Sequence, residues 1–184
     1  MSIYRPEFAS AMRLLAAIST EMDAEGFLPP VLVGGAAVEI YTAGTIATGD
    51  FDLVTACQDI LEEIMQRHGF VRPSGPGVAT RGWIHPTFKL GFEIVSDSLL
   101  DGAADRDYIQ LIDASAEQQI AVIGVEDLIA DRMGQYASGT APEMLMQART
   151  LFTLSKDLDL SYLEERIRAE TAGDHGISDL EDKA

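Results

Sequence analysis

The first part of the chain alternates amphipathic stretches with short runs of β-branched and aliphatic residues. Apolar residues recur at helical spacing in Pro6–Glu25 and again in Gln58–His68. Short apolar or alternating runs, which fit strands with a buried face, occupy Val31–Val33 and Asp50–Val54. Strands and helices that alternate in this way predict an α/β fold.

Later segments carry further strand patterns. In the clearest of them, apolar residues alternate with Lys89, Gly91 and Glu93, so that Lys89 and Glu93 share one face. A loop with Asp101, Asp105 and Asp107 follows, which we interpret as solvated because it lacks the pattern of a calcium loop. The strands predicted here are Thr80–Ile84, Phe88–Val95, Ile109–Ile112 and Gln119–Ile123.

The remainder of the chain has the pattern of helices. We expect helices from Val125 onward, at Ala141–Ser155 and at Asp159–Glu170. Residues 173–184 are acidic with little apolar content, and this composition predicts a disordered tail. The predicted organisation is therefore a core of residues 1–124, helices in 125–172 packed on the same domain, and the tail.

Two aspartates and a glycine pair are the clearest candidates for chemistry. On a strand, Asp50 and Asp52 point to one face while Phe51 points to the other. Neighbouring carboxylates repel each other unless a cation lies between them, and such hard oxygen ligands suit Mg²⁺. Upstream, Gly34 and Gly35 end a strand and open a helix, where backbone N–H groups and the helix dipole favour a phosphate. Together these features predict a site for a metal-bound phosphate.

This order of motifs resembles the nucleotidyltransferase superfamily with the DNA polymerase beta-like fold. The glycine pair and the run Thr48–Asp52 (TGDFD) are most similar to the AbiEii-like and minimal nucleotidyltransferases of toxin–antitoxin systems. The chain departs from many members in carrying Gly-Gly where they have Gly-Ser. The resemblance covers roughly the first 100 residues well and the rest loosely. It implies a mixed sheet flanked by helices, with a helical C-terminal portion.

The resemblance also implies an activity and a set of site residues. The reaction would transfer a nucleoside monophosphate from a nucleoside triphosphate to an unidentified acceptor, protein or RNA, within a toxin–antitoxin system. The expected catalytic residues and ligands for one or two Mg²⁺ ions are Asp50, Asp52 and Glu93. The expected nucleotide-binding residues are Gly34, Gly35, Thr48, Lys89 and Arg132.

Two of these assignments compete with alternatives in the sequence. Glu93 is preferred to Asp97 as the third acid because it lies inside the alternating run, where apolar neighbours fix its direction. Arg132 could instead be a surface residue that pairs with Glu126 or Asp131. Both choices depend on where the tertiary structure places these side chains.

The charge of the chain restricts its partners. The 184 residues include 30 acids against 13 lysines and arginines, a net charge of −17, which repels polyanions. We therefore favour a protein acceptor over a nucleic acid, and expect a protein partner or a homo-oligomer. The longest stretch without an acid, Gly69–Phe92, is either a flap that brings positive charge to the triphosphate or a hairpin with neutral exposed positions.

The same composition predicts a compartment. No apolar run is long enough to span a membrane, and the first residues lack the pattern of a signal peptide. One cysteine, Cys57, cannot form an internal disulfide, which fits a reducing environment. We expect a cytoplasmic protein.

Two other functions remain open. A phosphohydrolase of the haloacid dehalogenase family also uses Asp-x-Asp, but its motif needs an apolar strand leading into the first aspartate, and Ala47–Gly49 precedes it here. The other alternative is an inactive nucleotidyltransferase fold that binds a partner protein, as an antitoxin does. Retention of both aspartates disfavours it.

Overall fold

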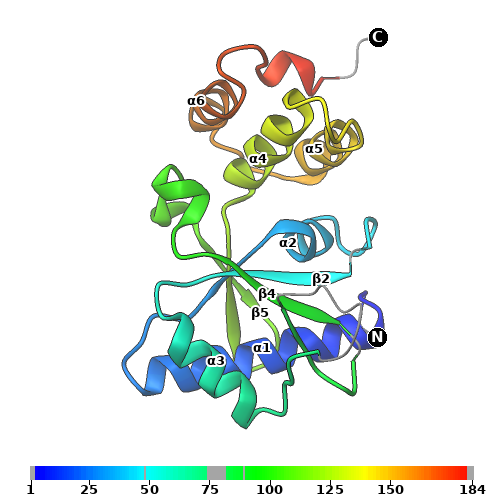
Figure 1. Cartoon of the computed structure of the whole chain (residues 1–184). Helices are drawn as coiled ribbons and strands as arrows, with labels where there is room; N and C mark the ends of the chain where they lie inside the picture. Colours follow the sequence, from blue (N-terminus) through cyan, green and yellow to red (C-terminus); the bar gives the residue numbers. More distant parts are fainter. Residues whose placement is uncertain (1–2, 48, 74–81, 89, 182–184) are drawn as a thin grey trace.

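The computed structural model describes residues 3–47, 49–73, 82–88 and 90–181. Within these residues, helices cover both faces of a six-stranded mixed sheet with the order β3-β4-β2-β1-β6-β5 (Figure 1). The strands are β1 (Val31–Val33), β2 (Asp50–Val54), β3 (Trp83–Ile84), β4 (Gly91–Ser96), β5 (Gln110–Asp113) and β6 (Gln119–Val122). The helices are α1 (Pro6–Ala24), α2 (Gly34–Tyr41), α3 (Gln58–Arg67), α4 (Val125–Ala137), α5 (Met144–Leu154) and α6 (Leu160–Glu170). The predicted α/β class is confirmed.

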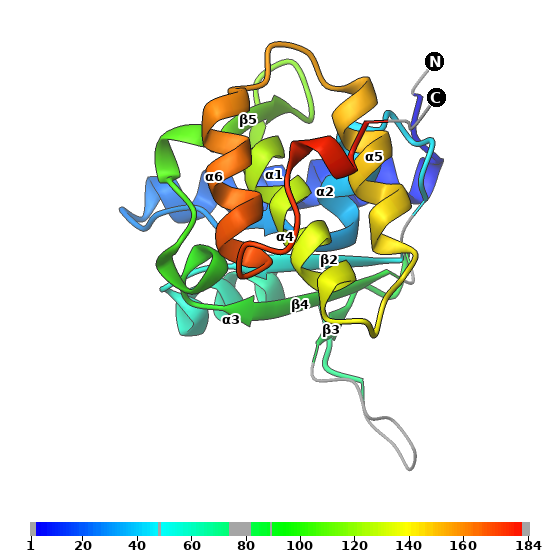
Figure 2. The same cartoon turned by 90° about the horizontal axis from the view of Figure 1, so that it is seen from above.

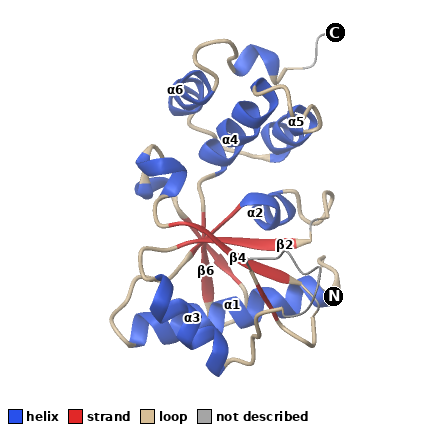
Figure 3. Cartoon of the chain, viewed as in Figure 1, coloured by secondary structure: helices blue, strands red, loops and turns tan. Residues whose placement is uncertain are grey.

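One face of the sheet packs against α1 and α3 (Figure 3). The apolar positions of the central strands supply this core, with Phe51 stacked on Phe92 at 4.6 Å between ring centroids. Phe8 of α1 packs on Phe51 at 5.0 Å, and Phe70 meets Phe92 edge-on at 4.7 Å. Because strand residues alternate between faces, burying Phe51 directs its neighbours Asp50 and Asp52 to the opposite face.

Strand pairing fixes which residues lie beside those aspartates. Strand β2 pairs antiparallel with β1, which places Val33 beside Asp52. It pairs parallel with β4, which places Glu93 beside Asp52 and Gly91 beside Asp50. The second face of the sheet therefore carries the acidic positions of β2 and β4 under α2 and the C-terminal helices (Figure 1).

The C-terminal helices form a layer of their own above this face. Seen from above, α4 lies between α5 and α6 (Figure 2), and it packs against both. A buried ion pair joins α4 to α6, with Arg166 Nε 2.7 Å from Asp127 Oδ1, and the Tyr162 hydroxyl also donates to Asp127. The predicted helical C-terminal portion is confirmed. No helix in the described ranges is long and apolar enough to cross a membrane.

Several predicted element boundaries are wrong. The strand predicted at Phe88–Val95 begins only at Gly91, because the Phe88 N–H bonds to the His85 carbonyl at 3.1 Å in a turn. Of the strand predicted at Thr80–Ile84, the described part contains Trp83–Ile84. The helix predicted from Ala141 begins at Met144, after a turn in which the Met144 N–H bonds to the Ala141 carbonyl.

The expectation of a disordered tail is wrong for residues 173–181. They contain a short 3-10 helix, η3 (Ile177–Asp179), and pack on the C-terminal helices. Leu180 is 2% exposed, and Arg149 of α5 donates to the Asp179 carbonyl at 2.8 Å. The Ile177 N–H donates to Glu164 of α6 at 2.7 Å. The composition of the segment did not reveal this docking, because the segment is held by one buried leucine and a few specific hydrogen bonds rather than by many apolar residues.

We therefore expect Leu180→Ala to destabilise the fold. A buried leucine truncated to alanine loses about 2–5 kcal/mol, from lost transfer energy and from the cavity that remains. Urea unfolding should show this loss, whereas Glu181→Ala, at the next and exposed position, should leave the midpoint unchanged. Equal stability of the two variants would show that the tail does not dock.

Candidate functional site

A cavity of about 460 Å³ lies between the sheet, the start of α2 and α4. Asp52 on the sheet and the Gly34–Gly35 turn line this cavity, and so does Arg132 of α4. The loop after β4 contributes Ser98 and Asp101 to the remaining wall. Residues that are far apart in the sequence thus converge on one space.

The glycine turn and Asp52 approach each other closely. Gly34 opens α2 with φ of +62°, a left-handed backbone conformation that residues other than glycine rarely adopt. A Cβ atom added to Gly34 would lie 2.9 Å from Asp52 Cγ, so a side chain there has no room. The Gly35 N–H donates a hydrogen bond to the Asp52 carboxylate. The turn therefore already binds one anionic group.

The electrostatics of Asp52 reflect its neighbours. Burial raises the pKa of its carboxyl above the usual range, and the charges of Asp50 and Glu93 add to that rise. The Gly35 hydrogen bond and the charge of Arg132 lower the pKa of Asp52 only in part. The acids on β2 and β4 therefore repel one another, and a cation between them would relieve that repulsion.

The residues present fit a Mg²⁺ ion. Asp50 and Asp52 offer hard oxygen ligands on one strand face, and each carboxylate lies in a space that a Cβ atom on a neighbouring glycine would fill. In the described part of the chain, no three His, Cys, Asp or Glu side chains form a group that could hold a metal ion by themselves. Mg²⁺ needs only one or two protein carboxylates, so this does not conflict with the fit. The assignment of Glu93 as a third ligand stays a prediction.

Arg132 is buried rather than at the surface, with 6% of its area exposed. Its Nη1 donates to Gln135 at 3.2 Å and lies 3.7 Å from an Asp131 oxygen, a long ion pair. Its Nε and Nη2 are buried and have no hydrogen-bond partner among the described residues. The alternative partner, Glu126, accepts instead from the Asp159 N–H. A buried guanidinium so weakly paired is costly unless an anion joins it.

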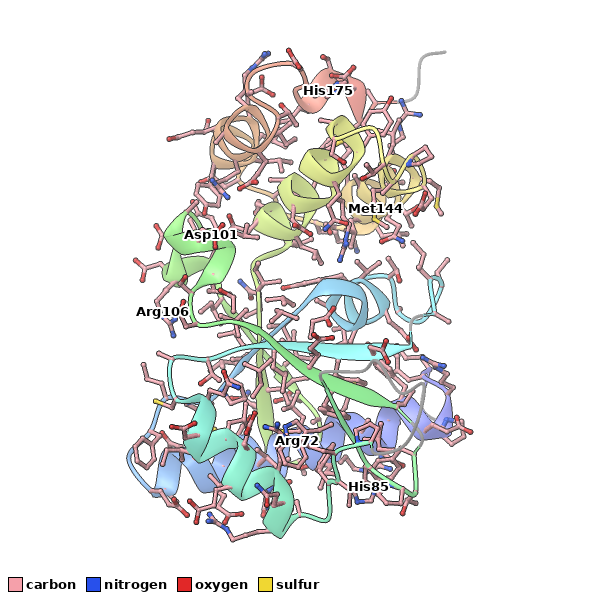
Figure 4. All side chains as sticks on the ribbon, in the orientation of Figure 1. Arg72, His85, Asp101, Arg106, Met144 and His175 are labelled. Atoms are coloured by element: carbon pink, nitrogen blue, oxygen red, sulfur yellow. The ribbon has the colours of Figure 1, made fainter. Side chains whose placement is uncertain are left out.

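The remaining predicted residues do not all meet at this cavity. Thr48 and Lys89 lie outside the described residues. Arg72, from the acid-free segment, pairs with Glu62 of α3 and lies over the Trp83 ring, 4.8 Å from its centroid. It is therefore on the other side of the sheet from Asp101 (Figure 4), and it does not bring charge to the cavity.

Other lining residues were not predicted as parts of a site. Asp101, interpreted as a member of a solvated loop, lines the cavity, and both it and Leu100 have left-handed backbones with φ of 54° and 45°. Such conformations are strained for residues other than glycine. On α4, Asp131 and Gln135 also line the cavity. Gln135 lies three residues after Arg132 and four after Asp131, so helical spacing from either could have identified it, whereas nothing in the sequence marked Asp101.

Comparison with known proteins identifies the fold. Protein-family models and curated proteins gave no match to the sequence. Among solved structures, the antibiotic-resistance factor ANT(2″)-Ia matches with a TM-score of 0.56 and 15% identity, over 89% of this chain and 92% of its own. An antigenic nucleotidyltransferase-like protein from Paracoccidioides brasiliensis matches with a TM-score of 0.59 and 12% identity, over 93% and 90%. The chain therefore has the nucleotidyltransferase fold.

Proposed function

We propose that this protein is a Mg²⁺-dependent nucleotidyltransferase that transfers a nucleoside monophosphate from a nucleoside triphosphate to an acceptor. One observation carries the proposal. The Asp52 carboxylate lies against the Gly34–Gly35 turn, in a cavity that also contains the weakly paired, buried guanidinium of Arg132. A metal-binding carboxylate, an anion-binding turn and a buried cation in one space are what a metal-bound triphosphate requires.

Each of these residues has a role in the reaction. The N–H groups at the start of α2 other than that of Gly35, which donates to Asp52, bind phosphate oxygens, and Arg132 offsets phosphate charge from α4. Asp50 and Asp52 hold Mg²⁺, which when bound neutralises phosphate charge and orients the triphosphate. Thr48 joins the nucleotide contacts, as the sequence resemblance implies, and so does Lys89, as the strand pattern of the sequence predicts.

The bond changes follow from the triphosphate. The acceptor oxygen forms a bond to the α-phosphorus, the bond from that phosphorus to the bridging oxygen breaks, and pyrophosphate leaves. Glu93, beside Asp52 on β4, accepts the proton of the acceptor hydroxyl. The transferred nucleotide stays on the acceptor as a phosphodiester.

The charge of the chain bears on the acceptor: a net charge of −17 disfavours an RNA acceptor and favours a protein. We assign the reaction to a toxin–antitoxin pair because the motifs resemble those of AbiEii-like and minimal nucleotidyltransferases. The single cysteine favours a reducing compartment, and we place the reaction in the cytoplasm.

A thermal-shift panel of ATP, GTP, CTP and UTP, each with and without Mg²⁺, tests the proposal. A ligand that binds only the folded state stabilises it by about 2.7 kcal/mol at a hundred times its Kd. We expect at least one triphosphate to raise the melting temperature with Mg²⁺ and not in EDTA. If none does, the inactive partner-binding alternative becomes the better interpretation.

Arg132→Met separates the anion-binding role of Arg132 from a structural one. Methionine keeps the packing of the aliphatic stem while it removes a buried charge whose one ion pair among the described residues is the long one to Asp131, and whose Nη1 also donates to Gln135. We expect the melting temperature without ligand to be no lower than in the wild type, and the shift caused by Mg²⁺-triphosphate to disappear. Arg13→Met, at an exposed position of α1, is the matched control and should keep the shift. A full ligand shift in Arg132→Met would exclude Arg132 from the site.

A further inference from the structure

Each of the two aspartates lies against a glycine of a neighbouring element. Asp52 lies against Gly34, where a left-handed backbone already requires glycine. Asp50 lies against Gly91 of β4, its partner in the parallel pairing of β2 and β4. A Cβ atom added to Gly91 would lie 2.6 Å from Asp50 Oδ1 and 3.2 Å from Asp50 Cγ. The Asp50 carboxylate therefore occupies the space that any side chain at position 91 would need.

Backbone geometry does not explain a glycine at position 91. Gly91 is not among the residues with positive φ, so its conformation is open to other amino acids. It is the first residue of β4, where it pairs with Asp50 of β2 and Ile84 of β3, and glycine within a strand is unfavourable by up to roughly 0.5–1 kcal/mol relative to alanine. Close approach of another group is one known reason for glycine in a strand, and the group that approaches Gly91 is the Asp50 carboxylate.

Little else fixes the direction of Asp50. It is exposed at the first position of β2, and no hydrogen bond or ion pair to a described residue holds its carboxylate. Asp52, two residues on, is half-buried against the glycine turn. The open surface at Gly91 is thus the feature of the fold that lets Asp50 lie flat over the β2–β4 pair, on the same face as Asp52.

We propose that Gly91 is a positioning residue: by lacking a side chain, it keeps the Asp50 carboxylate on the sheet face where it shares a divalent cation with Asp52. This inference rests on the proposed function, since it assumes that Asp50 and Asp52 bind the metal. A methyl group at position 91 displaces the carboxylate towards solvent. It leaves the backbone intact, because the atoms it meets belong to the flexible Asp50 side chain.

Mn²⁺ binding to Gly91→Ala, followed by electron paramagnetic resonance of the free ion, tests the inference. We expect Mn²⁺ affinity to fall by about 10-fold or more, the range seen when groups that orient metal ligands are removed. In EDTA the melting temperature should be no lower than that of the wild type, since alanine suits a strand better than glycine. Gly49→Ala is the matched control: it adds the same methyl group one residue before Asp50, with no atom within 4 Å apart from those of its chain neighbours, and should bind Mn²⁺ like the wild type.

A double-mutant cycle identifies Asp50 as the intermediary. Asp50→Asn alone should weaken Mn²⁺ binding, and adding Gly91→Ala to it should cause no further loss, because the displaced group no longer binds metal. Additive losses, a lower melting temperature of Gly91→Ala in EDTA, or wild-type Mn²⁺ affinity in Gly91→Ala would each overturn the role of Gly91. If Gly91→Ala binds Mn²⁺ like the wild type while Asp50→Asn still weakens binding, the role of Gly91 is wrong but the proposed function survives. Absence of Mn²⁺ binding in the wild type would overturn both.

Discussion

Asp52→Asn is expected to fold like the wild type and to lose at least about 100-fold in affinity for Mg²⁺-nucleotide. Removing a direct metal ligand should weaken binding more than removing a residue that only orients a ligand. Asparagine has the size of aspartate and can still accept the Gly35 N–H bond, so the glycine turn keeps its partner. The neutral side chain also relieves repulsion from Asp50 and Glu93, and stability without ligand should therefore not fall. What is lost is a charged oxygen ligand.

Titration calorimetry with Mg²⁺-triphosphate measures this loss, with the melting temperature in EDTA as the test of folding. Asp97→Asn removes a carboxylate of the same kind from an exposed position just after β4, and it should bind like the wild type. Comparable affinities in Asp52→Asn and Asp97→Asn would show that the metal site is elsewhere. A marked fall in melting temperature in EDTA would instead give Asp52 a structural role.

The second large effect is expected at Asp127, which is 0% exposed on α4. Its carboxylate accepts from Arg166 Nε at 2.7 Å and from the Tyr162 hydroxyl at 3.0 Å. Asp127→Ala leaves Arg166, itself 6% exposed, with Glu170 as its remaining partner in an ion pair. Breaking one side of a buried pair costs about 3–5 kcal/mol, and we expect the lower end because Glu170 remains.

Chemical unfolding of Asp127→Ala tests this estimate. Glu63→Ala is the control, since it removes an exposed partner of Arg67 and should change stability by less than about 1 kcal/mol. The double variant Asp127→Leu with Arg166→Met should recover most of the loss, because a buried pair can be replaced by apolar residues of similar volume. A small effect of Asp127→Ala would mean that the pair does not hold α4 to α6.

The sequence determined the parts of the fold that depend on local patterns. Alternation in Asp50–Val54 placed both aspartates on one face of a strand, and apolar residues at helical spacing identified α1 and α3. Side chains repeat on one face every two residues in a strand and every 3.6 residues in a helix, so these patterns show which side chains can be buried together. The glycine pair followed by Asp-x-Asp led to the nucleotidyltransferase fold through its resemblance to a family. The predicted start of β4 was wrong because a turn at Phe88 replaces the strand that the alternating pattern indicates.

Tertiary structure alone decided what lies beside each of these residues. The parallel pairing of β2 with β4 set Glu93 beside Asp52 and Gly91 beside Asp50, and no local pattern encodes the register of strands separated by α3. The burial of Arg132 depends on how α4 packs over the sheet. The docking of Leu180 depends on a surface made by α5 and α6, so the composition of the last residues could not reveal it. Such long-range contacts are decided by how faces fit together, whereas the sequence determines only which faces need a partner.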